Sequence, residues 1–191
     1  MSIEIEIVED GNIEQCRDLC NELMSFQKSL AIIAPEAFND MNFETRLKAS
    51  FENSPVNQII IAKDNGVPIG YVFSTIENVN SGDKSYIPDW APVDGLQDVK
   101  GFYPEWDDFP QKVGCLNHLF FKESYRGMGI GSKLLNMAME WLESFPDVDV
   151  SFVYISNGND VGFDFYIKHG FIFSHDVFGG FIKAAYKFKY K

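Results

Sequence analysis

Apolar and polar residues follow two periods along the chain, and together these predict a mixed α/β fold. A period of two marks strands with one buried face, and a period near 3.6 marks amphipathic helices. Alternation over residues 3–8 predicts a first strand, which Asp10-Gly11 ends. Apolar residues at helical spacing follow over 13–24, and a second helix is expected over 35–51.

An antiparallel hairpin is predicted next. Residues 58–62 and 70–75 are strand-like, and Asp64-Asn65-Gly66 between them is typical of a tight hairpin turn. The later predicted elements are a strand at 115–121, a helix at 129–145, a strand at 148–155, a short helix at 160–168 and closing strands at 171–173 and 181–188.

Residues 79–110 follow neither period and predict a long loop. The segment holds four prolines, three glycines and six aromatic residues. Loops beyond about 15 residues are usually functional or disordered, and this aromatic content argues against disorder. Seven acidic residues against two lysines leave the loop with a local charge of −5.

Length and charge limit the classes of function. A chain of 191 residues with 46% hydrophobic and 23% charged residues fits one globular domain. The 16 Lys and Arg against 28 Asp and Glu give a net charge of −12. Such a surface repels phosphate backbones and anionic lipid, so no nucleic acid and no membrane partner is expected. A basic substrate would be attracted.

The cysteines and the first residues indicate a cytoplasmic protein. Cys16, Cys20 and Cys115 are odd in number and lack C-x-x-C spacing, so we expect buried packing rather than redox or metal roles. Residues 1–10 lack the basic and apolar regions of a signal peptide. No apolar run approaches the roughly 20 residues that a membrane span needs.

The strongest chemical signal is a glycine cluster between a predicted strand and a predicted helix. Gly127, Gly129 and Gly131 let the backbone bend so that successive N–H groups converge. The start of the helix adds unsatisfied N–H groups and the positive end of its dipole. These groups form an anion site suited to a pyrophosphate, with the charge of Arg126 at its rim.

Two common nucleotide signatures do not fit this cluster. Ser132 stands where a dinucleotide motif needs its third glycine, and Gly131-Ser132-Lys133 reverses the P-loop order. The cluster does fit Arg-x-x-Gly-x-Gly, met by Arg126, Gly129 and Gly131. In this motif the chain resembles the GNAT superfamily of N-acetyltransferases, whose acetyl-CoA site carries it. Alone, the motif also fits a helix start that merely needs glycine.

A second motif strengthens the resemblance. The family's later pattern, Asn-x-x-Ala-x-x-x-Tyr-x-x-x-Gly-Phe, is matched in spacing by Asn159, Gly162, Tyr166, Gly170 and Phe171. Gly162 replaces the usual alanine. The order of elements is similar too, apart from residues 79–110. The resemblance implies a single N-acetyltransferase domain over residues 1–191. Its fold would be α/β (α+β), with a mixed, mostly antiparallel central sheet flanked by helices and a long inserted loop at about 79–110.

The resemblance implies how acetyl-CoA is bound. The backbone of Leu119 and Phe121 would pair with the pantetheine arm as an added strand does. Backbone N–H groups would hold the pyrophosphate along a turn made of Gly127, Met128, Gly129, Ile130, Gly131 and Ser132, beside Arg126. Asn159 would hydrogen-bond the arm. A plain helix N-cap is the alternative for Asn159, and one side chain can do both.

Two residues are implied for catalysis, Tyr166 and Asn117. Tyr166 stands where the family often has a general acid for the departing CoA thiolate; a buried core aromatic is the alternative. Asn117 stands where many relatives carry a Glu as base. An amide cannot take a proton at neutral pH, but it can orient a water that relays one.

Other candidates for the base remain open. His118 is expected on the opposite strand face from Asn117, Leu119 and Phe121, and is more often structural. The acidic loop is a further candidate source. His169 and His175 show no partner spacing, and no metal site is expected.

The implied activity is direct transfer of an acetyl group from acetyl-CoA to a primary amine, carried by a small molecule or a basic peptide. Because residues 79–110 are aromatic and acidic, we expect them to border the acceptor site and to favour a cationic amine; a merely solvated loop is the alternative. A non-catalytic acyl-CoA sensor and a transferase of another acyl group also remain open. So does a homodimer.

Overall fold

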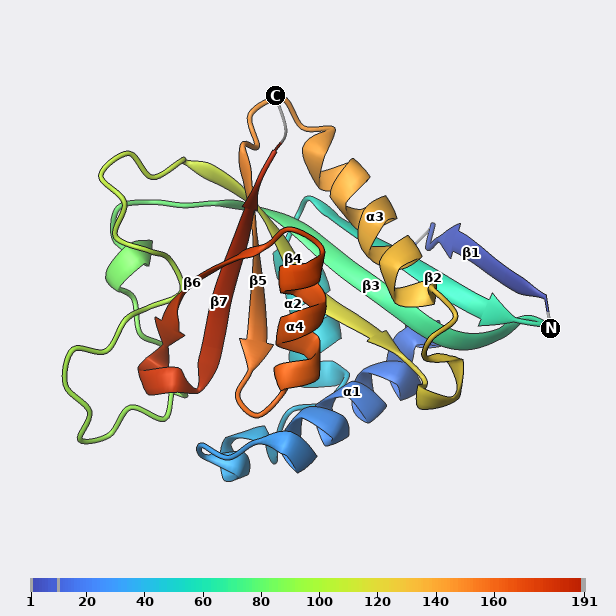
Figure 1. The fold of residues 1–191 in the computed structure, drawn as a ribbon, viewed down its shortest axis with the longest axis horizontal. Helices are drawn as coiled ribbons and strands as arrows, with labels where there is room; N and C mark the ends of the chain where they lie inside the picture. The colour runs from blue at the N-terminus through green and yellow to red at the C-terminus, as the bar shows by residue number, and fades with distance from the viewer. Residues whose placement is uncertain (1, 10, 190–191) are drawn as a thin grey trace.

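The strands of the computed structural model, which describes residues 2–9 and 11–189, form one seven-stranded sheet in the order β1-β2-β3-β4-β5-β7-β6 (Figure 1). The strands are β1 (Ile3–Ile7), β2 (Asn57–Asp64), β3 (Val67–Asn78), β4 (Lys112–Phe121), β5 (Val150–Ser156), β6 (Ile172–Val177) and β7 (Ile182–Phe188). Every neighbouring pair is antiparallel except β4 and β5. The predicted mixed, mostly antiparallel sheet is confirmed.

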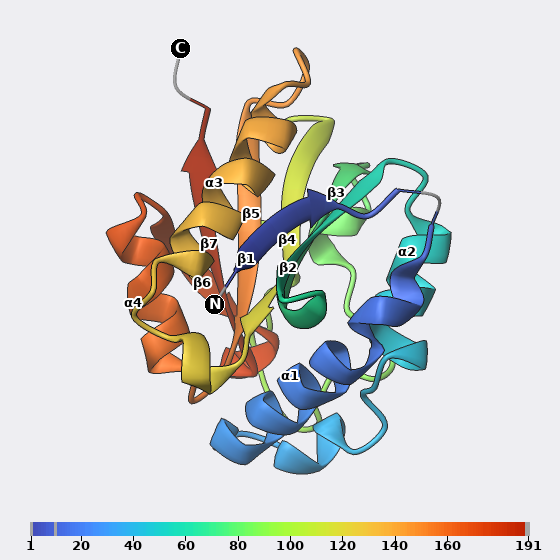
Figure 2. The same ribbon diagram turned by 90° about the vertical axis from the view of Figure 1, so that its right-hand side faces the viewer.

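Helices cover both faces of the sheet (Figure 2). In the described part of the chain the α-helices are α1 (Arg17–Leu30), α2 (Ala49–Asn53), α3 (Ile130–Glu143) and α4 (Asp160–Lys168). Short helical turns are η1 (Ile13–Cys16), η2 (Pro35–Phe38), η3 (Glu44–Lys48), η4 (Asp83–Ser85), η5 (Glu123–Tyr125) and η6 (Phe178–Gly180). Among these helices none is both long and apolar enough to cross a membrane.

Each face of the sheet has its own hydrophobic core. Along β3, Val72 packs on the α3 side, whereas Tyr71 and Phe73 pack on the α1 side. This strand is buried over nearly its whole length because helices cover both of its faces. Cys16 and Cys20 are fully buried on the α1 side, as their spacing predicts.

The β2–β3 hairpin forms as predicted. Asn65 and Gly66 at its tip both have positive φ, 49° and 81°. Two consecutive residues of this kind are typical of the turn whose twist matches that of the flanking strands.

The continuous second helix predicted for residues 35–51 is wrong. The segment instead contains η2, a turn, the π-helical η3 and the short α2. The Asn42 side chain accepts hydrogen bonds from the backbone N–H groups of Glu44 and Thr45, at 2.9 and 3.2 Å. An asparagine that bonds to nearby backbone groups in this way competes with a helix and starts a new one.

Residues 79–110 form the predicted loop, in which η4 is the short helical turn, and they pack against β6 and β7 (Figure 1). Phe178 donates its backbone N–H to the Lys100 carbonyl at 3.0 Å, and His175 Nε2 lies 2.9 Å from the Gly101 carbonyl. Aromatic rings anchor the rest, since Trp106 contacts Phe152 with 5.9 Å between ring centroids. The loop is therefore held to the sheet by its own aromatic residues.

His118 is a buried structural histidine, as expected from its position on a strand. Its Nδ1 lies 2.9 Å from the Tyr71 hydroxyl, and its ring meets Tyr71 and Phe73 edge-on. Burial, together with the nearby charge of Arg46, lowers the pKa of His118 from 6.5 to about 3. The imidazole is therefore neutral in the folded protein at neutral and mildly acidic pH.

This neutral histidine should make the fold sensitive to acid. Below pH 6.5 the unfolded chain binds a proton at His118, whereas the folded chain does not until about pH 3. We expect this group to lower the free energy of unfolding by about 1.4 kcal/mol for each unit by which the pH is lowered within that interval. The free energy of unfolding, measured by urea denaturation at several pH values from 7 to 4, should fall less steeply with pH in His118→Gln than in the wild type. The other titrating groups are the same in both proteins. Equal slopes would contradict the assignment.

Candidate active site

The glycine turn between β4 and α3 borders open space. Gly127 and Gly129 have φ of 77° and 76°, which other residues rarely adopt, and a Cβ at either would meet nothing within 4 Å. The helical hydrogen bonds of α3 begin with the backbone N–H of Lys133, which donates to the Gly129 carbonyl at 3.0 Å. The N–H groups just before Lys133 therefore have no acceptor within the helix. The backbone fits the expected anion site.

The other members of the turn differ in role. Met128 is exposed, whereas Ile130 is buried in the core below α3. Gly131 does not bend the backbone as expected, because it lies inside α3. A Cβ on Gly131 would come 2.6 Å from the Phe121 ring, so glycine here lets α3 approach the end of β4. This close packing fixes the turn relative to Phe121.

Strands β4 and β5 run together for only part of their length. They pair at Gly114, Cys115 and Leu116 of β4 and then part, β4 staying with β3 and β5 with β7. The β3–β4 register shifts at Asn117, because Leu116 pairs with Ser74 and His118 with Phe73. Asn117 is thus the extra residue of a β-bulge, a feature that re-aims a side chain.

Beyond the bulge, β4 has an open edge that faces away from β3. Lys122 donates its N–H to the Ile69 carbonyl at 2.8 Å, so its backbone faces β3. Since successive residues of a strand direct their backbone groups to opposite sides, Phe121 and Leu119 direct theirs to the side that β5 has left. The edge from Phe121 back to Asn117 spans about 13 Å at 3.3 Å per residue.

A cavity of about 240 Å³, here called the β4–β5 cavity, lies where the two strands part. It is lined by Gln27, Phe38, Met41, Arg46, Glu77, Trp90, Phe102, Tyr103, Cys115, Asn117, Tyr154, Ser156, Phe181 and Ile182. Most of these side chains are aromatic or apolar. Among the described residues that line it, Arg46 and Glu77 carry the charges, one of each sign.

Asn117 faces this cavity, not the side of Leu119 and Phe121 where strict alternation would put it. Its Nδ2 donates to Thr75 Oγ1 at 2.9 Å, and Thr75 is fully buried. Leu119 packs on the α3 side instead. The expectation of a shared face is wrong because the bulge changes the alternation at Asn117.

Residues 79–110 reach the cavity with their aromatic side chains but not with their acids. Trp90, Phe102 and Tyr103 belong to its wall. Asp107 and Asp108 line a separate hollow beside Lys84. The charge argument for a cationic acceptor therefore finds no acidic loop residue on the cavity wall.

Tyr166 projects from α4 into the core beneath α3. Its ring meets Phe165 and Phe171 edge-on, and only 8% of the residue is exposed. Burial raises the pKa of its hydroxyl, which therefore stays protonated at neutral pH. No described side chain hydrogen-bonds to this hydroxyl, so Tyr166 combines a core position with an unused proton donor.

Asn159 is the N-cap of α4, one of the two roles open to it. Its Oδ1 accepts from the Gly162 N–H at 3.0 Å, which leaves the Nδ2 donors for another partner. A Cβ on residue 162 would lie 2.5 Å from Nδ2. Glycine in place of the family's alanine thus makes room for this orientation of Asn159.

Arg126 and Ser132 both have partners within the protein. The Arg126 guanidinium lies 3.2 Å from Glu123 and 5.3 Å from the Phe26 ring centroid, on the side of α1. Ser132 Oγ lies 2.9 Å from Nε2 of His169, a partner that sequence spacing does not reveal. Among the described residues, no group of three His, Cys, Asp or Glu is placed to hold a metal ion.

Comparison with known proteins identifies the family. The sequence profile of the acetyltransferase (GNAT) family matches residues 20–171. The chain belongs to the GNAT acetyltransferase family. A search of curated protein sequences finds no match.

Solved structures show the same GNAT fold at low sequence identity. A PaiA N-acetyltransferase from Thermoplasma acidophilum, crystallised with coenzyme A, is 19% identical with a TM-score of 0.63, covering 99% of this chain and all of its own. Naa50 from Arabidopsis thaliana, bound to the bisubstrate analogue CoA-Ac-MVNAL, is 16% identical with a TM-score of 0.58. The match covers 98% of this chain and 99% of Naa50. A GNAT acetyltransferase from Staphylococcus aureus is 13% identical with a TM-score of 0.56, and the match covers 98% of this chain and 99% of that protein.

Proposed function

We propose that this GNAT protein transfers an acetyl group from acetyl-CoA directly to the primary amine of a small acceptor. The observation that carries the proposal is the open edge of β4, which joins the glycine turn at Phe121 to the β4–β5 cavity at Asn117. A donor anchored at the turn and extended along this edge would end where an acceptor can enter.

Backbone groups would make most of the donor contacts. The N–H groups from Gly127 to Ser132 would bind the pyrophosphate, and those of Leu119 and Phe121 would pair with the pantetheine arm. The free Nδ2 of Asn159 would donate to the arm while Oδ1 keeps the cap. When bound, acetyl-CoA supplies the activated acetyl group as a thioester.

Proton transfers would fall to side chains. An amine must be neutral to attack a carbonyl carbon, so a base must take its proton, and Glu77 is the carboxylate among the described cavity residues. Asn117 would hold the amine or a relaying water. Tyr166 would donate its proton to the departing thiolate, and its raised pKa keeps that proton available. Nitrogen gains the acetyl group, and the CoA sulfur leaves as a thiol.

Replacing Glu77 tests the base. Glu77→Gln preserves shape but cannot take a proton, and we expect kcat/KM for a good amine to fall about 10²-fold at neutral pH. The loss should shrink as the pH rises, since more of the amine is then already neutral. Asp108→Asn, which removes an acid outside the cavity, should leave kcat/KM unchanged. Equal effects of the two substitutions would remove Glu77 from the base role.

The activity itself is tested by CoA release from acetyl-CoA with a panel of primary amines. Turnover with any amine, together with an N-acetylated product by mass spectrometry, supports the proposal. Saturable binding of acetyl-CoA without turnover would contradict it and favour a sensing domain. The same assay with longer acyl-CoA donors tests the choice of acyl group, because a faster donor than acetyl-CoA would correct that part of the proposal.

A further inference from the structure

Three residues that line the β4–β5 cavity each have a buried polar atom without a partner. In the described part of the chain four buried side-chain nitrogen or oxygen atoms have no hydrogen bond: Arg46 Nε, Tyr154 Oη, Ser156 Oγ and Ser74 Oγ. All but Ser74 belong to residues that line this cavity. Because buried polar atoms are nearly always bonded in native proteins, such a gathering indicates a site for a polar ligand.

Arg46 is the charged member of this group and has no counter-ion. Among the described residues no carboxylate oxygen lies within 4.0 Å of its side-chain nitrogens. The titratable groups that interact with its charge are Cys20, Tyr71 and His118, and all three are neutral at neutral pH. A guanidinium stays charged and offers five donors, and leaving its buried Nε without a partner is costly.

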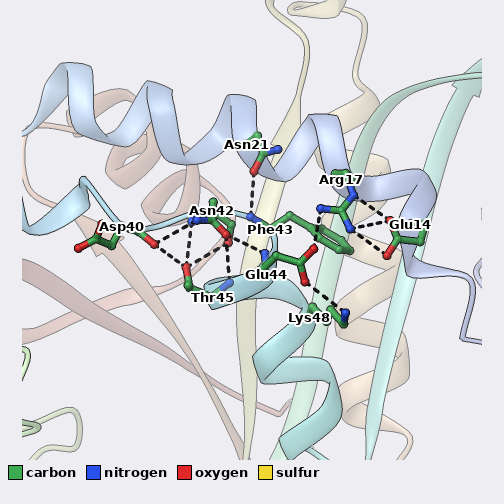
Figure 3. A network of polar contacts seen from close by, with 9 residues as sticks. All are labelled: Glu14, Arg17, Asn21, Asp40, Asn42, Phe43, Glu44, Thr45 and Lys48. Atoms are coloured by element: carbon green, nitrogen blue, oxygen red, sulfur yellow. Dashed lines mark hydrogen bonds and ion pairs between the residues drawn. The ribbon is translucent and has the colours of Figure 1, made fainter.

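Polar contacts of residues 42–45 and of Lys48, which Figure 3 shows, anchor the segment that contains Arg46. Phe43 donates its N–H to Asn21 Oδ1 of α1 at 2.9 Å. Arg17 of α1 forms an ion pair with Glu44 at 2.8 Å and lies 4.2 Å from the Phe43 ring centroid. Asn42 caps the turn that follows, as Figure 3 also shows.

Within this anchored segment, η3 is π-helical, and Arg46 lies at its centre. π-turns are rare and often occur at functional sites. Several polar contacts fix this segment, whereas the guanidinium of Arg46, the one charge that the segment contributes to the cavity, has no ion-pair partner among the described residues.

We propose that the amine acceptor also carries a carboxylate, which Arg46 binds together with the hydroxyls of Tyr154 and Ser156. The inference rests on the proposed acetyl transfer and names the class of its acceptor. A guanidinium matches a carboxylate with two parallel N–H···O bonds, and each hydroxyl can donate one more.

The rest of the cavity limits the acceptor further. Glu77, which lines the same cavity, would stand near the amine and would repel a doubly charged phosphate, so the single charge of a carboxylate fits better. The aromatic wall, with Phe38, Phe102 and Phe181, suits an apolar body. A volume of about 240 Å³ suits an acceptor group of amino-acid size. The acceptor class is thus an apolar amino acid or a close analogue.

The test compares acceptors in which a neutral amide replaces the carboxylate, with each kcat/KM corrected for the fraction of the acceptor amine that is neutral at the assay pH. With acetyl-CoA saturating, kcat/KM is measured for L-leucine and L-phenylalanine and for L-leucinamide and L-phenylalaninamide. We expect the acids to exceed the amides by at least about tenfold. In Arg46→Gln the ratio of acid to amide should fall close to one because kcat/KM falls for the acids and stays unchanged for the amides. Arg46→Lys should restore part of the ratio. Lys48→Gln, which removes an exposed charge from the same segment, should keep the wild-type ratio.

A binding measurement separates this inference from catalysis. Calorimetry with N-acetyl-L-leucine and its amide, on protein saturated with CoA, should show binding of the acid that Arg46→Gln abolishes and Lys48→Gln keeps. Wild-type protein that acetylates the amides as well as the acids would overturn the carboxylate assignment and leave the proposed acetyl transfer standing. Binding of the acid without turnover of any amine would overturn the proposed acetyl transfer and leave the carboxylate site standing. Circular dichroism confirms that each variant is folded.

Discussion

A Gly129→Val protein is expected to bind acetyl-CoA at least about 10²-fold more weakly than the wild type. Valine at φ 76° is strained, and backbone relaxation would turn the N–H groups at the start of α3 away from a common anion. The side chain would also enter space that holds no protein atom within 4 Å of the Cβ position. Each charge-assisted N–H bond lost costs about 1.5–3 kcal/mol, so one or two account for the effect. Isothermal calorimetry measures it.

A matched control separates this effect from strain in general. Gly66, at the tip of the β2–β3 hairpin, has φ 81° and likewise nothing within 4 Å of a Cβ. Gly66→Val should therefore lower the free energy of unfolding by a similar amount and leave acetyl-CoA affinity unchanged. A folded Gly129→Val protein with wild-type affinity would remove the glycine turn from the donor site.

The parts of the fold that local sequence determines were predictable. Apolar periodicity places nearly every strand and helix, and the hairpin follows from Asn65-Gly66, whose positive φ values few other pairs adopt. The break in the second helix depends on Asn42, whose side chain bonds to the backbone instead of extending the helix. Propensity over a window does not reveal that choice, because it depends on how the segment docks on α1.

The β-bulge at Asn117 could not be predicted from β4 alone. A bulge is a property of a pair of strands, set here by the register of Leu116 and His118 against β3. Alternation along one strand therefore gives the correct face for Leu119 and the wrong one for Asn117. The consequence for function is direct, since the amide faces the cavity.

The candidate site was predicted where it is continuous in sequence. The glycine turn and the Asn159–Tyr166 segment are local motifs, whereas the cavity collects residues from α1, η3, β3, β5 and the long loop. Two signals could have found its charged members. Glu77 follows Tyr71 and Phe73 on the inward face of β3, and Arg46 lies one turn after the buried Phe43. A charge on a buried face needs a partner or a function.

Tyr166→Phe is expected to lower kcat by about 10²-fold or more while acetyl-CoA affinity stays within about twofold of the wild type. The substitution removes one oxygen and leaves the ring that packs on Phe165 and Phe171. The hydroxyl has no hydrogen-bond partner among the described residues, so its loss breaks no internal bond. Since burial raises the pKa of Tyr166, the wild-type enzyme keeps this donor protonated through neutral and mildly alkaline pH.

The matched control for this substitution is Tyr125→Phe. Tyr125 donates its hydroxyl to Asp64 at 3.0 Å and has no part in the proposed proton transfers, so removal of this hydroxyl should leave kcat unchanged. Single-turnover kinetics then locates the Tyr166 effect, because loss of a proton donor slows acetyl transfer itself, whereas loss of packing lowers the melting temperature and weakens binding. A fall in kcat of less than about threefold would assign Tyr166 to the core alone and leave water to protonate the departing thiolate.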